Sequence, residues 1–145
     1  EGVIKISLSN KTTEEIEKWC QNHLGKGITE GTGFTTEAKC QILNYLRGRR
    51  KSLDFPVVHI NSPFRKKVLE AQREIPYGET RSYGEVAHML ESPRASRAVG
   101  SANANNPLPL YYPCHRIILS DGSLGEFVGG LIVKCFLLNL EFRYY

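Results

Sequence analysis

The sequence predicts a small α/β protein made of two lobes, residues 1–60 and residues 61–145. In the first lobe, two helical patterns lie between two short extended stretches. In the second lobe, one helical pattern follows another, and several begin with residues that cap helices well. The 145 residues are 41% hydrophobic and 23% charged, which is enough apolar surface to bury a core. We therefore expect an α/β N-terminal lobe followed by a mainly α C-terminal lobe.

The N-terminal lobe begins and ends with an extended segment. In Val3–Leu8 (VIKISL), apolar and polar side chains alternate, which places the apolar ones on one face of a strand. Phe55–Ile60 (FPVVHI) is predicted to be extended as well. The order strand, helix, helix, strand follows for this lobe.

Two helices are expected between these segments. The first has Thr12 or Thr13 as its N-cap and ends at Gly25. The second begins near Thr35 and ends at Gly48. The side chains expected to point from the second helix into the core are Ile42, Leu43 and Leu46.

The C-terminal lobe opens with two clear helix starts. Ser62 followed by Pro63 is an N-cap with a first-turn proline, and this helix is expected to run to about Ile75. Ser82 with Glu85 three residues later forms a capping box for the next helix.

Two more helices complete this lobe. The cap-and-proline pattern recurs at Ser92, which predicts a helix over Arg94–Ala104. The last helix is expected over Gly130–Glu141, with four side chains available for the core: Leu131, Phe136, Leu137 and Leu140. The two short helices on either side of Ser92 match a helix-turn-helix, although an ordinary helical hairpin has the same pattern.

Charge is distributed unevenly along the chain. The net charge is +4, from 19 Lys and Arg against 15 Asp and Glu, which is too small to prove a polyanionic partner. However, no acidic residue occurs between Ser92 and Ser120, whereas Arg94, Arg97 and Arg116 fall inside this stretch. Such a patch suits contacts with phosphates, and it also suits a solvated helix face.

The cysteines do not form a disulfide or zinc pattern. There is no C-x-x-C pair, so reduced thiols in the cytoplasm fit best, and no apolar run is long enough to span a bilayer. A zinc site built from Cys20, His23, Cys40 and His59 matches no recognised ligand spacing, so we expect no metal. Cys135 is expected to be a packed core thiol.

The remaining cysteine, Cys114, lies in the stretch YYPCHRII. Only a thiolate attacks, and its formation is helped by a nearby base or a positive neighbour, which His115 and Arg116 supply. A histidine base usually needs an acceptor on its other nitrogen, and Glu141 is a candidate. The alternative is a small buried thiol beside a surface histidine.

The motifs around Cys114 favour the nucleophile. The segments IPYGETRSYGEVA, SRAVGSANANNP, PCHRII and LLNLE resemble, in order and spacing, the O6-alkylguanine-DNA alkyltransferases over Pro63–Glu141. The N-terminal lobe matches only in size and rough organisation. The resemblance implies a ribonuclease-H-like N-terminal lobe and a winged helix-turn-helix C-terminal lobe.

The resemblance also implies a catalytic role for four residues. Cys114 is then the alkyl acceptor, and His115 acts as its base through a bound water. Glu141 orients His115 and stabilises its charge. Asn106 braces the turn that holds Cys114.

Further residues are implied to bind the substrate and the DNA. Tyr83 rotates the nucleotide and hydrogen-bonds the guanine, and Arg97 fills the gap that the flipped base leaves. The helix that carries Arg97 enters the minor groove in this family. The implied substrate-binding residues are Tyr83, Phe127, Val128, Ile117 and Lys134. The implied DNA-binding residues are Arg97, Arg94, Ser96, Ala98 and Ser101.

The implied reaction is a single turnover, because the thioether that forms on Cys114 is not hydrolysed by any ordinary side chain. No cofactor is expected, since the substrate carries the group that is transferred. The expected partner is double-stranded DNA containing O6-alkylguanine. Without DNA we expect a monomer, in the cytoplasm of a prokaryote or the nucleus of a eukaryote.

The sequence departs from the family in the loop GSLGEFVGG. Phe127 and Val128 stand where a tyrosine and a serine are usual, and Glu126 where a small or uncharged residue is usual. Near a phosphate, Glu126 would weaken DNA binding; turned outward, it would do little. Tyr111 and Tyr112 also replace aliphatic residues, and we expect them to pack under the active-site turn.

Two alternatives to the alkyltransferase remain open. A thiol hydrolase using Cys114 and His115 would turn over repeatedly, whereas an alkyltransferase is consumed. A non-catalytic, alkyltransferase-like protein would bind alkylated DNA and signal to another repair pathway, although it would not need Cys114.

Overall fold

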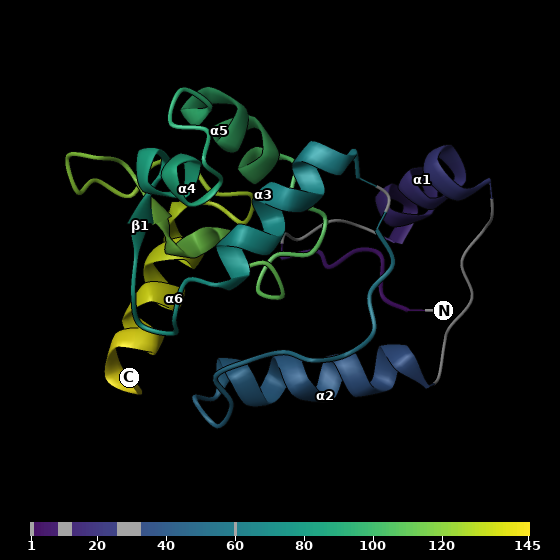
Figure 1. The fold of residues 1–145 in the computed structure, drawn as a ribbon. Helices are drawn as coiled ribbons and strands as arrows, with labels where there is room; N and C mark the ends of the chain where they lie inside the picture. Colours follow the sequence, from purple (N-terminus) through teal and green to yellow (C-terminus); the bar gives the residue numbers. More distant parts are fainter. Residues whose placement is uncertain (1, 9–12, 26–32, 60) are drawn as a thin grey trace.

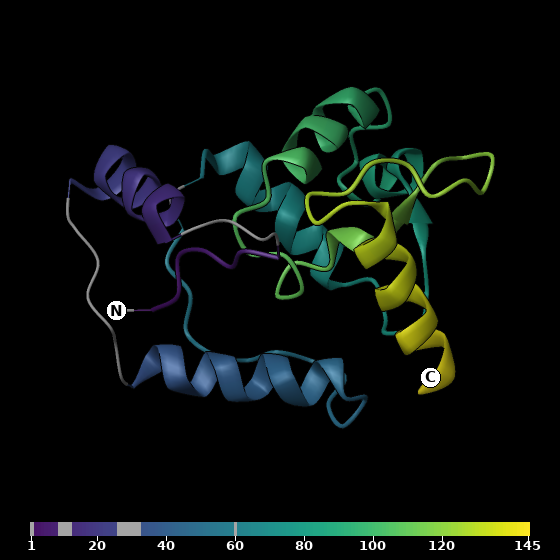
Figure 2. The same ribbon diagram turned by 180° about the vertical axis from the view of Figure 1, so that it is seen from behind.

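The computed structural model describes residues 2–8, 13–25, 33–59 and 61–145. Figures 1 and 2 show α1 and α2 set apart from the cluster that α3 to α6 form. In chain order the elements are α1 (Thr13–Leu24), α2 (Phe34–Leu46), α3 (Pro63–Arg73), β1 (Arg81–Ser82), α4 (Tyr83–Met89), α5 (Ser96–Ala104), the 3₁₀ helix η1 (Cys114–Arg116), β2 (Ile117–Ile118) and α6 (Leu131–Arg143).

The order strand, helix, helix, strand is not found in the described part of the N-terminal lobe, because its first and last segments form no regular strand. They meet in one parallel bridge between Val3 and Val57, and the Val58 amide donates to the Val3 carbonyl over 2.9 Å. The Ile6 amide instead donates to the carbonyl of Pro107, at 2.8 Å, so the first segment leaves its partner after one bridge. Ile60 lies outside the described residues. The sheet of a ribonuclease-H-like lobe therefore stays a prediction.

Both N-terminal helices form close to their predicted bounds. The helix α1 starts at Thr13 and is followed by Gly25 in the left-handed conformation that glycine allows, with φ of 63°. The alternative cap, Thr12, lies outside the described residues.

The inward face of α2 differs from the prediction. Ile42 and Leu46 pack partly against the core, but Leu43 is 40% exposed. The helical period places residues three and seven positions apart on one side, and the buried residues of α2 follow it: Ala38, Gln41 and Tyr45. Leu43 lies on the opposite side of the helix from that stripe.

The predicted caps of α3 and α4 are confirmed. The hydroxyl of Ser62 accepts from the amide of Arg65 over 3.4 Å. Ser82 and Glu85 form the full capping box, because each side chain binds the other residue's amide. These local signals need only the residues of one helical turn.

The start of α5 was predicted too early. The carbonyl of Ser92 accepts from the amide of Ala95 over 2.8 Å, so residues 92–95 form a turn and the helix begins at Ser96. Arg94 therefore lies in the turn before the helix. The helices α4 and α5 pack together, and α3 lies against both, as in a helix-turn-helix. The core they share consists of Val68, Ile75, Val86, Ala87, Val99, Ala102 and Ile117.

A short parallel sheet connects this helical cluster to the cysteine turn. Arg81 of β1 pairs with Ile117 of β2, and Ser82 pairs with Ile118. Since β1 runs directly into α4 and η1 runs directly into β2, the pairing holds the start of α4 beside the Cys114 turn.

The helix α6 packs against the core through fewer residues than expected. Leu137 and Leu140 are buried as predicted, but Leu131 and Phe136 are 55% and 51% exposed. Cys135 is also exposed, so it is not a core thiol. The inward stripe also carries Lys134 and Glu141, since these lie three and four residues from the buried leucines.

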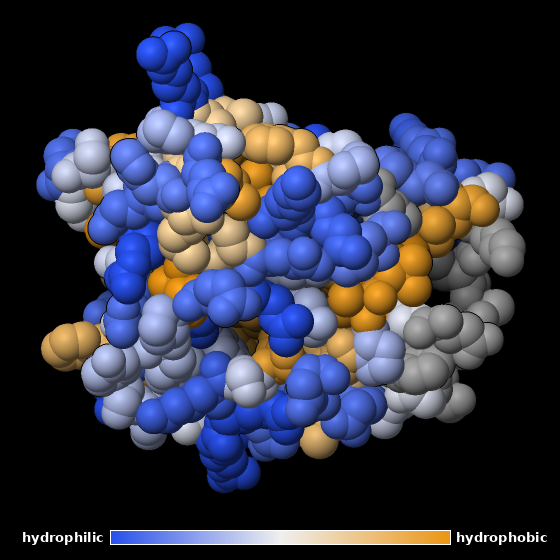
Figure 3. Space-filling view, viewed as in Figure 1, coloured by the Kyte–Doolittle hydropathy of each residue, from blue (hydrophilic) through white to orange (hydrophobic). Residues whose placement is uncertain are grey.

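A second core cluster joins residues on both sides of the predicted boundary at residues 60 and 61. It includes Tyr45 and Phe55 from the N-terminal lobe and Leu69, Leu108 and Leu137 from the C-terminal lobe. The division into these two lobes stays a prediction. Apolar side chains also reach the surface in patches between polar ones (Figure 3). Among the described helices, none is long and apolar enough to cross a bilayer.

Candidate active site

The turn that carries Cys114 lies inside the protein. Every residue from Asn106 to Ile117 is buried, and Cys114 has no exposed surface. Its amide donates to the Tyr112 carbonyl over 2.7 Å, which closes a tight turn around Pro113. Leu110 is held at φ of 73°, a conformation that leucine rarely adopts, so this loop depends on its surroundings for its shape.

Asn106 holds this turn together. Its side-chain amide donates to the carbonyl of Tyr112 over 2.8 Å, and its oxygen accepts from the amide of Leu108 over 2.9 Å. Asn106 also lowers the pKa of the Cys114 thiol. The structure therefore places Asn106 where it braces the turn that holds Cys114.

His115 and Glu141 form a buried pair. His115 Nε2 lies 2.6 Å from Glu141 Oε1, and neither side chain is more than 1% exposed. Glu141 is anionic, so Nε2 carries the proton in this bond, which leaves Nδ1 as an acceptor. Nδ1 has no hydrogen-bond partner among the described residues. His115 is thus oriented on one side and free to take a proton on the other.

Arg116 supports the same carboxylate and does not belong to a surface patch. It is 6% exposed, and its Nε donates to Glu141 Oε2 over 2.9 Å. Its Nη1 donates to the Ile75 carbonyl over 2.6 Å. The Gly78 amide adds a further bond to Glu141, at 2.9 Å. A role of Arg116 in a phosphate-binding patch is therefore excluded by its burial.

The ionisation of the pair follows from these contacts. Burial alone would raise the pKa of Glu141, but the hydrogen bonds and charges of His115 and Arg116 outweigh it and hold this pKa at about 2. Burial lowers the pKa of His115, and the bond to Glu141 opposes this. Near neutral pH, Glu141 is therefore charged and His115 is a neutral base.

The thiol itself is not activated in the resting protein. Burial raises the pKa of Cys114 to about 11, although Asn106 and the charge of Lys134 oppose the rise. Lys134 is fully buried, and its Nζ donates to the carbonyls of Ile117, at 2.5 Å, and of Leu124. Its ammonium therefore joins the strand that follows the Cys114 turn to the loop before α6.

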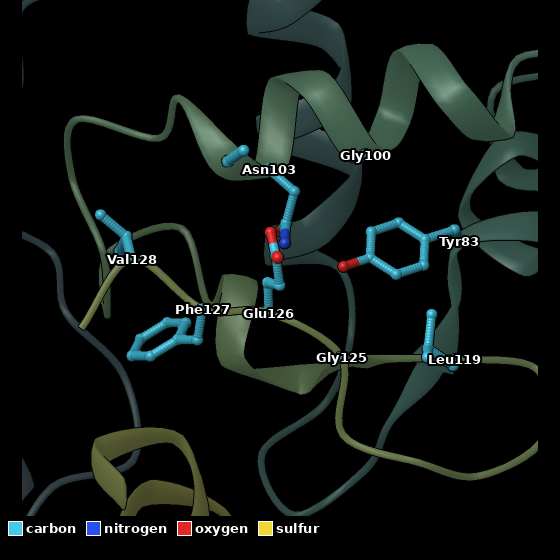
Figure 4. A pocket seen from close by; sticks show the side chains of 9 residues that line it. Tyr83, Gly100, Asn103, Leu119, Gly125, Glu126, Phe127 and Val128 are labelled. Atoms are coloured by element: carbon cyan, nitrogen blue, oxygen red, sulfur yellow. The ribbon is translucent and has the colours of Figure 1, made fainter. Parts of the chain in front are cut away.

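A cavity of about 490 Å³ opens beside this network (Figure 4). Its walls come from α4, α5 and the loop before α6. The lining residues are Tyr83, Gly100, Asn103, Ala104, Leu119, Gly125, Glu126, Phe127 and Val128. Of the predicted substrate-binding residues, Tyr83, Phe127 and Val128 line it, whereas Ile117 and Lys134 lie outside it and support the turn.

Tyr83 connects the cavity to the thiol. Burial raises its pKa, a hydrogen bond with Asn103 opposes the rise, and the negative charges of a Cys114 thiolate and of Glu126 add to it. Phe127 stands edge-on to the His115 ring, with 6.3 Å between ring centroids. Residues that line the cavity therefore lie near both the nucleophile and its base.

Glu126 points into the cavity, toward Asn103 and Tyr83 (Figure 4). This answers the question of its orientation, because the carboxylate is not turned away from the site. Val128, by contrast, is 47% exposed at the rim. Gly125 before them has φ of 65°, and a Cβ there would lie 3.3 Å from Leu119, so the loop needs glycine at this point.

Three of the five predicted DNA-binding side chains lie on the exposed face of α5. Arg97, Ala98 and Ser101 of α5 are exposed, and Ser96 is half-buried. The opposite face of α5 is buried through Val99, Ala102 and Asn103. Arg94 is exposed as well, but it projects from the turn before the helix.

The four residues weighed as zinc ligands have other neighbours. His23 stacks on Trp19, and the ring nitrogens of His59 lie 3.3 Å from the hydroxyl of Tyr112. Cys20 and Cys40 are free thiols. Across the described ranges, no three His, Cys, Asp or Glu side chains come together as metal ligands do.

Tyr111 and Tyr112 pack under the active-site turn as predicted. Their rings meet edge to face, with centroids 5.1 Å apart. Arg73 donates to the Tyr111 hydroxyl over 3.0 Å, and His59 contacts that of Tyr112. Both buried hydroxyls are thereby satisfied.

Sequence reasoning missed Tyr45. Its hydroxyl, which comes from α2 in the N-terminal lobe, donates to Glu141 Oε1 and lies 3.3 Å from His115 Nε2. The only signal in the sequence was its place on the buried stripe of α2. That position predicts burial but not a contact with residues so distant in the chain.

Comparisons with known proteins agree with this geometry. A family profile described as "6-O-methylguanine DNA methyltransferase, DNA binding domain" matches residues 63–143. The methylated-DNA–protein-cysteine methyltransferase of Methanosarcina acetivorans is 46% identical over 138 residues, which cover 95% of this chain and 83% of that protein. The inducible one of Bacillus subtilis is 37% identical over 143 residues, or 98% of this chain and 80% of that protein.

Solved structures show the same fold. The crystal structure of Mycobacterium tuberculosis OGT in complex with DNA has a TM-score of 0.73 and 40% identity, covering 75% of this chain and 68% of that one. The O6-methylguanine-DNA methyltransferase of Pyrococcus kodakaraensis has a TM-score of 0.70 and 29% identity, covering 88% of this chain and 78% of that one. With its buried Cys114, His115 and Glu141 all inside the matched region, the chain belongs to the methylated-DNA–protein-cysteine methyltransferase family.

Proposed function

We propose that this chain repairs alkylated DNA by moving an alkyl group from the O6 atom of guanine to the Sγ atom of its own Cys114. Family membership favours this transfer over a relative that only binds alkylated DNA, and over a thiol hydrolase. The observation that carries the residue assignment is the buried bond between His115 and Glu141, adjacent in the fold to a buried thiol.

The chemistry begins with removal of the thiol proton. Because the pKa of Cys114 is raised by burial, the thiolate forms only when a base accepts its proton. We assign this role to Nδ1 of His115, through a bridging water, with Glu141 stabilising the resulting imidazolium.

The transfer itself is a displacement at carbon. The sulfur lone pair forms the new S–C bond while the C–O6 bond breaks, and its electron pair stays on O6. Hydrogen-bond donors near O6 lower this barrier, and we assign that role to the Tyr83 hydroxyl and the amides of Phe127 and Val128. The product is a thioether on Cys114 and a guanine anion, which becomes unmodified guanine by taking up one proton at N1, equal in number to the proton that left the thiol. Each molecule therefore acts once.

The DNA partner is bound through the helix-turn-helix. The target carbon lies inside the base stack, so the nucleotide has to be flipped into a pocket, for which the cavity of about 490 Å³ is available. In this proposal Arg97 fills the gap that the flipped base leaves in the duplex, and Ala98 and Ser101 lie close to the minor groove. We also propose that the protein prefers O6-alkylguanine and docks on the minor groove of DNA. Without DNA it is a monomer, and it acts in the cytoplasm.

The test is a mass measurement on the intact protein. Incubation with a short duplex containing one O6-methylguanine should add one methyl group per molecule, on the peptide that contains Cys114. The signal should saturate at one and vanish in Cys114→Ser. Cys135→Ser is the matched control, because that thiol is exposed and lies outside the network, and it should methylate like the unchanged protein. Tight binding to the duplex without added mass would instead support the recognition-only relative.

A further inference from the structure

The N-terminal lobe places one polar group inside the catalytic network. Tyr45 of α2 is 1% exposed, and its hydroxyl donates to Glu141 Oε1. The same oxygen receives the hydrogen bond of His115, and Tyr45 Oη lies 3.3 Å from His115 Nε2. The three side chains therefore share a single carboxylate oxygen.

The Tyr45 hydroxyl is held as a neutral donor. Burial, followed by the neighbouring Glu141 charge, raises the pKa of Tyr45 far above its ordinary value. The hydroxyl therefore stays protonated in the folded protein, and its proton lies in the hydrogen bond to Glu141. A neutral donor draws charge away from the oxygen that also binds His115.

We propose that Tyr45 is a positioning residue that sets the strength of the hydrogen bond between Glu141 and His115. The expected effect on the rate of methyl transfer rests on the proposed function. The expected effect on the hydrogen bond between Glu141 and His115 does not, because it concerns the protein before any transfer. It means that residues 63–143, the region matched by the family profile, do not contain the whole network. The N-terminal lobe completes it through one hydroxyl.

Other charged groups also face His115 and have to be considered. Besides Glu141, they are Arg116 from η1 and Lys134 from α6, and both lower the pKa of His115. Removing the Tyr45 hydroxyl leaves these groups in place. Its loss should concentrate more negative charge on Glu141 Oε1, strengthen the bond to His115 and raise the pKa of His115.

The first measurement is an NMR titration of the His115 ring in Tyr45→Phe, using the full chain without DNA. We expect the pKa of His115 to rise by about one unit, which corresponds to a tenfold change in its proton affinity. The acid limb of the rate of methyl transfer should move up by the same amount. The rate should therefore fall in the acid range in which His115 titrates, while above pH 8 it should change little.

Tyr77→Phe is the matched control. The Tyr77 ring stands edge-on to Tyr45, with centroids 5.9 Å apart, and its hydroxyl has no hydrogen-bond partner within the described chain. This variant removes a neighbouring hydroxyl without touching the shared oxygen. An equal His115 shift in both variants would show a general effect of packing and overturn the proposal.

A second substitution keeps the test decisive if Tyr45→Phe does not fold. Replacing Tyr45 by 3-fluorotyrosine preserves the ring and makes the hydroxyl a stronger donor, so the pKa of His115 should move down. An unchanged titration in a folded variant of either kind overturns the proposal. Because the titration needs no alkyl transfer, its failure is distinguishable from failure of the proposed function.

Discussion

The buried network of His115, Arg116 and Glu141 and the loop from Glu126 to Val128 differ in how strongly each residue depends on its neighbours. In the network, Glu141 accepts bonds from His115, Arg116 and the Gly78 amide inside the protein, and each partner would be costly to leave alone. In the loop, Glu126 and Val128 are exposed at the cavity, so a substitution there does not leave a buried polar group without its hydrogen-bond partner.

The contrast separates the reaction from its selectivity. A group in the network cannot change without leaving a buried partner unsatisfied, so the chemistry tolerates little variation. A loop residue changes the shape and charge of the cavity at small cost to folding. This explains how the chain keeps the Cys114 turn while departing from its family at Glu126 to Val128. Breaking each region should therefore give effects of different size and kind.

The largest effect is expected from Glu141→Gln. Arg116 would stay buried with its charge uncompensated, and we expect a loss of about 3–5 kcal/mol of unfolding free energy. Urea unfolding of both proteins measures it. Glu126→Gln, a change of the same chemistry on the exposed loop, is the control and should shift stability by no more than about 0.5 kcal/mol. Equal shifts in the two variants would contradict the contrast.

Acid should destabilise the network next most strongly. The pKa of Glu141 is about 2 in the folded protein against an ordinary 4.5, so the folded state binds fewer protons between these values. This contribution is complete above pH 4.5 and is lost as pH falls toward 2, on the order of 3 kcal/mol in total.

Unfolding free energies measured at several pH values between 5 and 2 test this. Glu85 and Asp121 also have lowered pKa values, so part of the acid slope does not belong to Glu141. The difference between the unchanged protein and Glu141→Gln isolates the buried carboxylate. Parallel slopes in the two proteins would show that Glu141 does not titrate as the geometry requires.

What the sequence could predict depends on how local the determining contacts are. The caps at Ser62 and Ser82 were found because a capping bond joins residues three apart. The same local signal misplaced the start of α5, since Ser92 followed by proline suits a turn as well as a cap. The resemblance supplied Cys114, His115 and Glu141, and the structure brings the last two together.

Contacts between distant segments were beyond the sequence pattern. Nothing in the neighbourhood of Arg116 indicates that it faces Glu141 instead of phosphate, because the pairing depends on how α6 packs. Leu43 and Phe136 were expected inside because they are apolar, although only the helical stripe decides burial. Tyr45 shows the same gap for a functional contact.

Substitution of Arg97 should weaken DNA binding without altering the buried network. Arg97→Ala removes one exposed cation from α5, so affinity for duplex DNA should fall by about tenfold, and the salt dependence should decrease by roughly one phosphate contact. Fluorescence anisotropy across several salt concentrations measures both. Because we assign Arg97 to the gap that the flipped base leaves, the rate of methyl transfer at saturating DNA should fall as well. Arg94→Ala removes an exposed cation from the turn before the helix instead, so it shows whether the loss of affinity depends on where the charge lies.

The smallest effect concerns the charge of the loop. Glu126→Gln removes a carboxylate that points into the cavity where negative charge develops on guanine O6, so transfer should become about threefold faster. Single-turnover rates with O6-methylguanine duplex, at saturating protein, measure this. A duplex carrying an anionic alkyl group, O6-carboxymethylguanine, should gain more than the methyl substrate, because the repulsion then acts before and during transfer. If both substrates gain equally, Glu126 acts only on the leaving oxygen; if neither gains, its charge is screened by solvent, and the loop contributes shape alone.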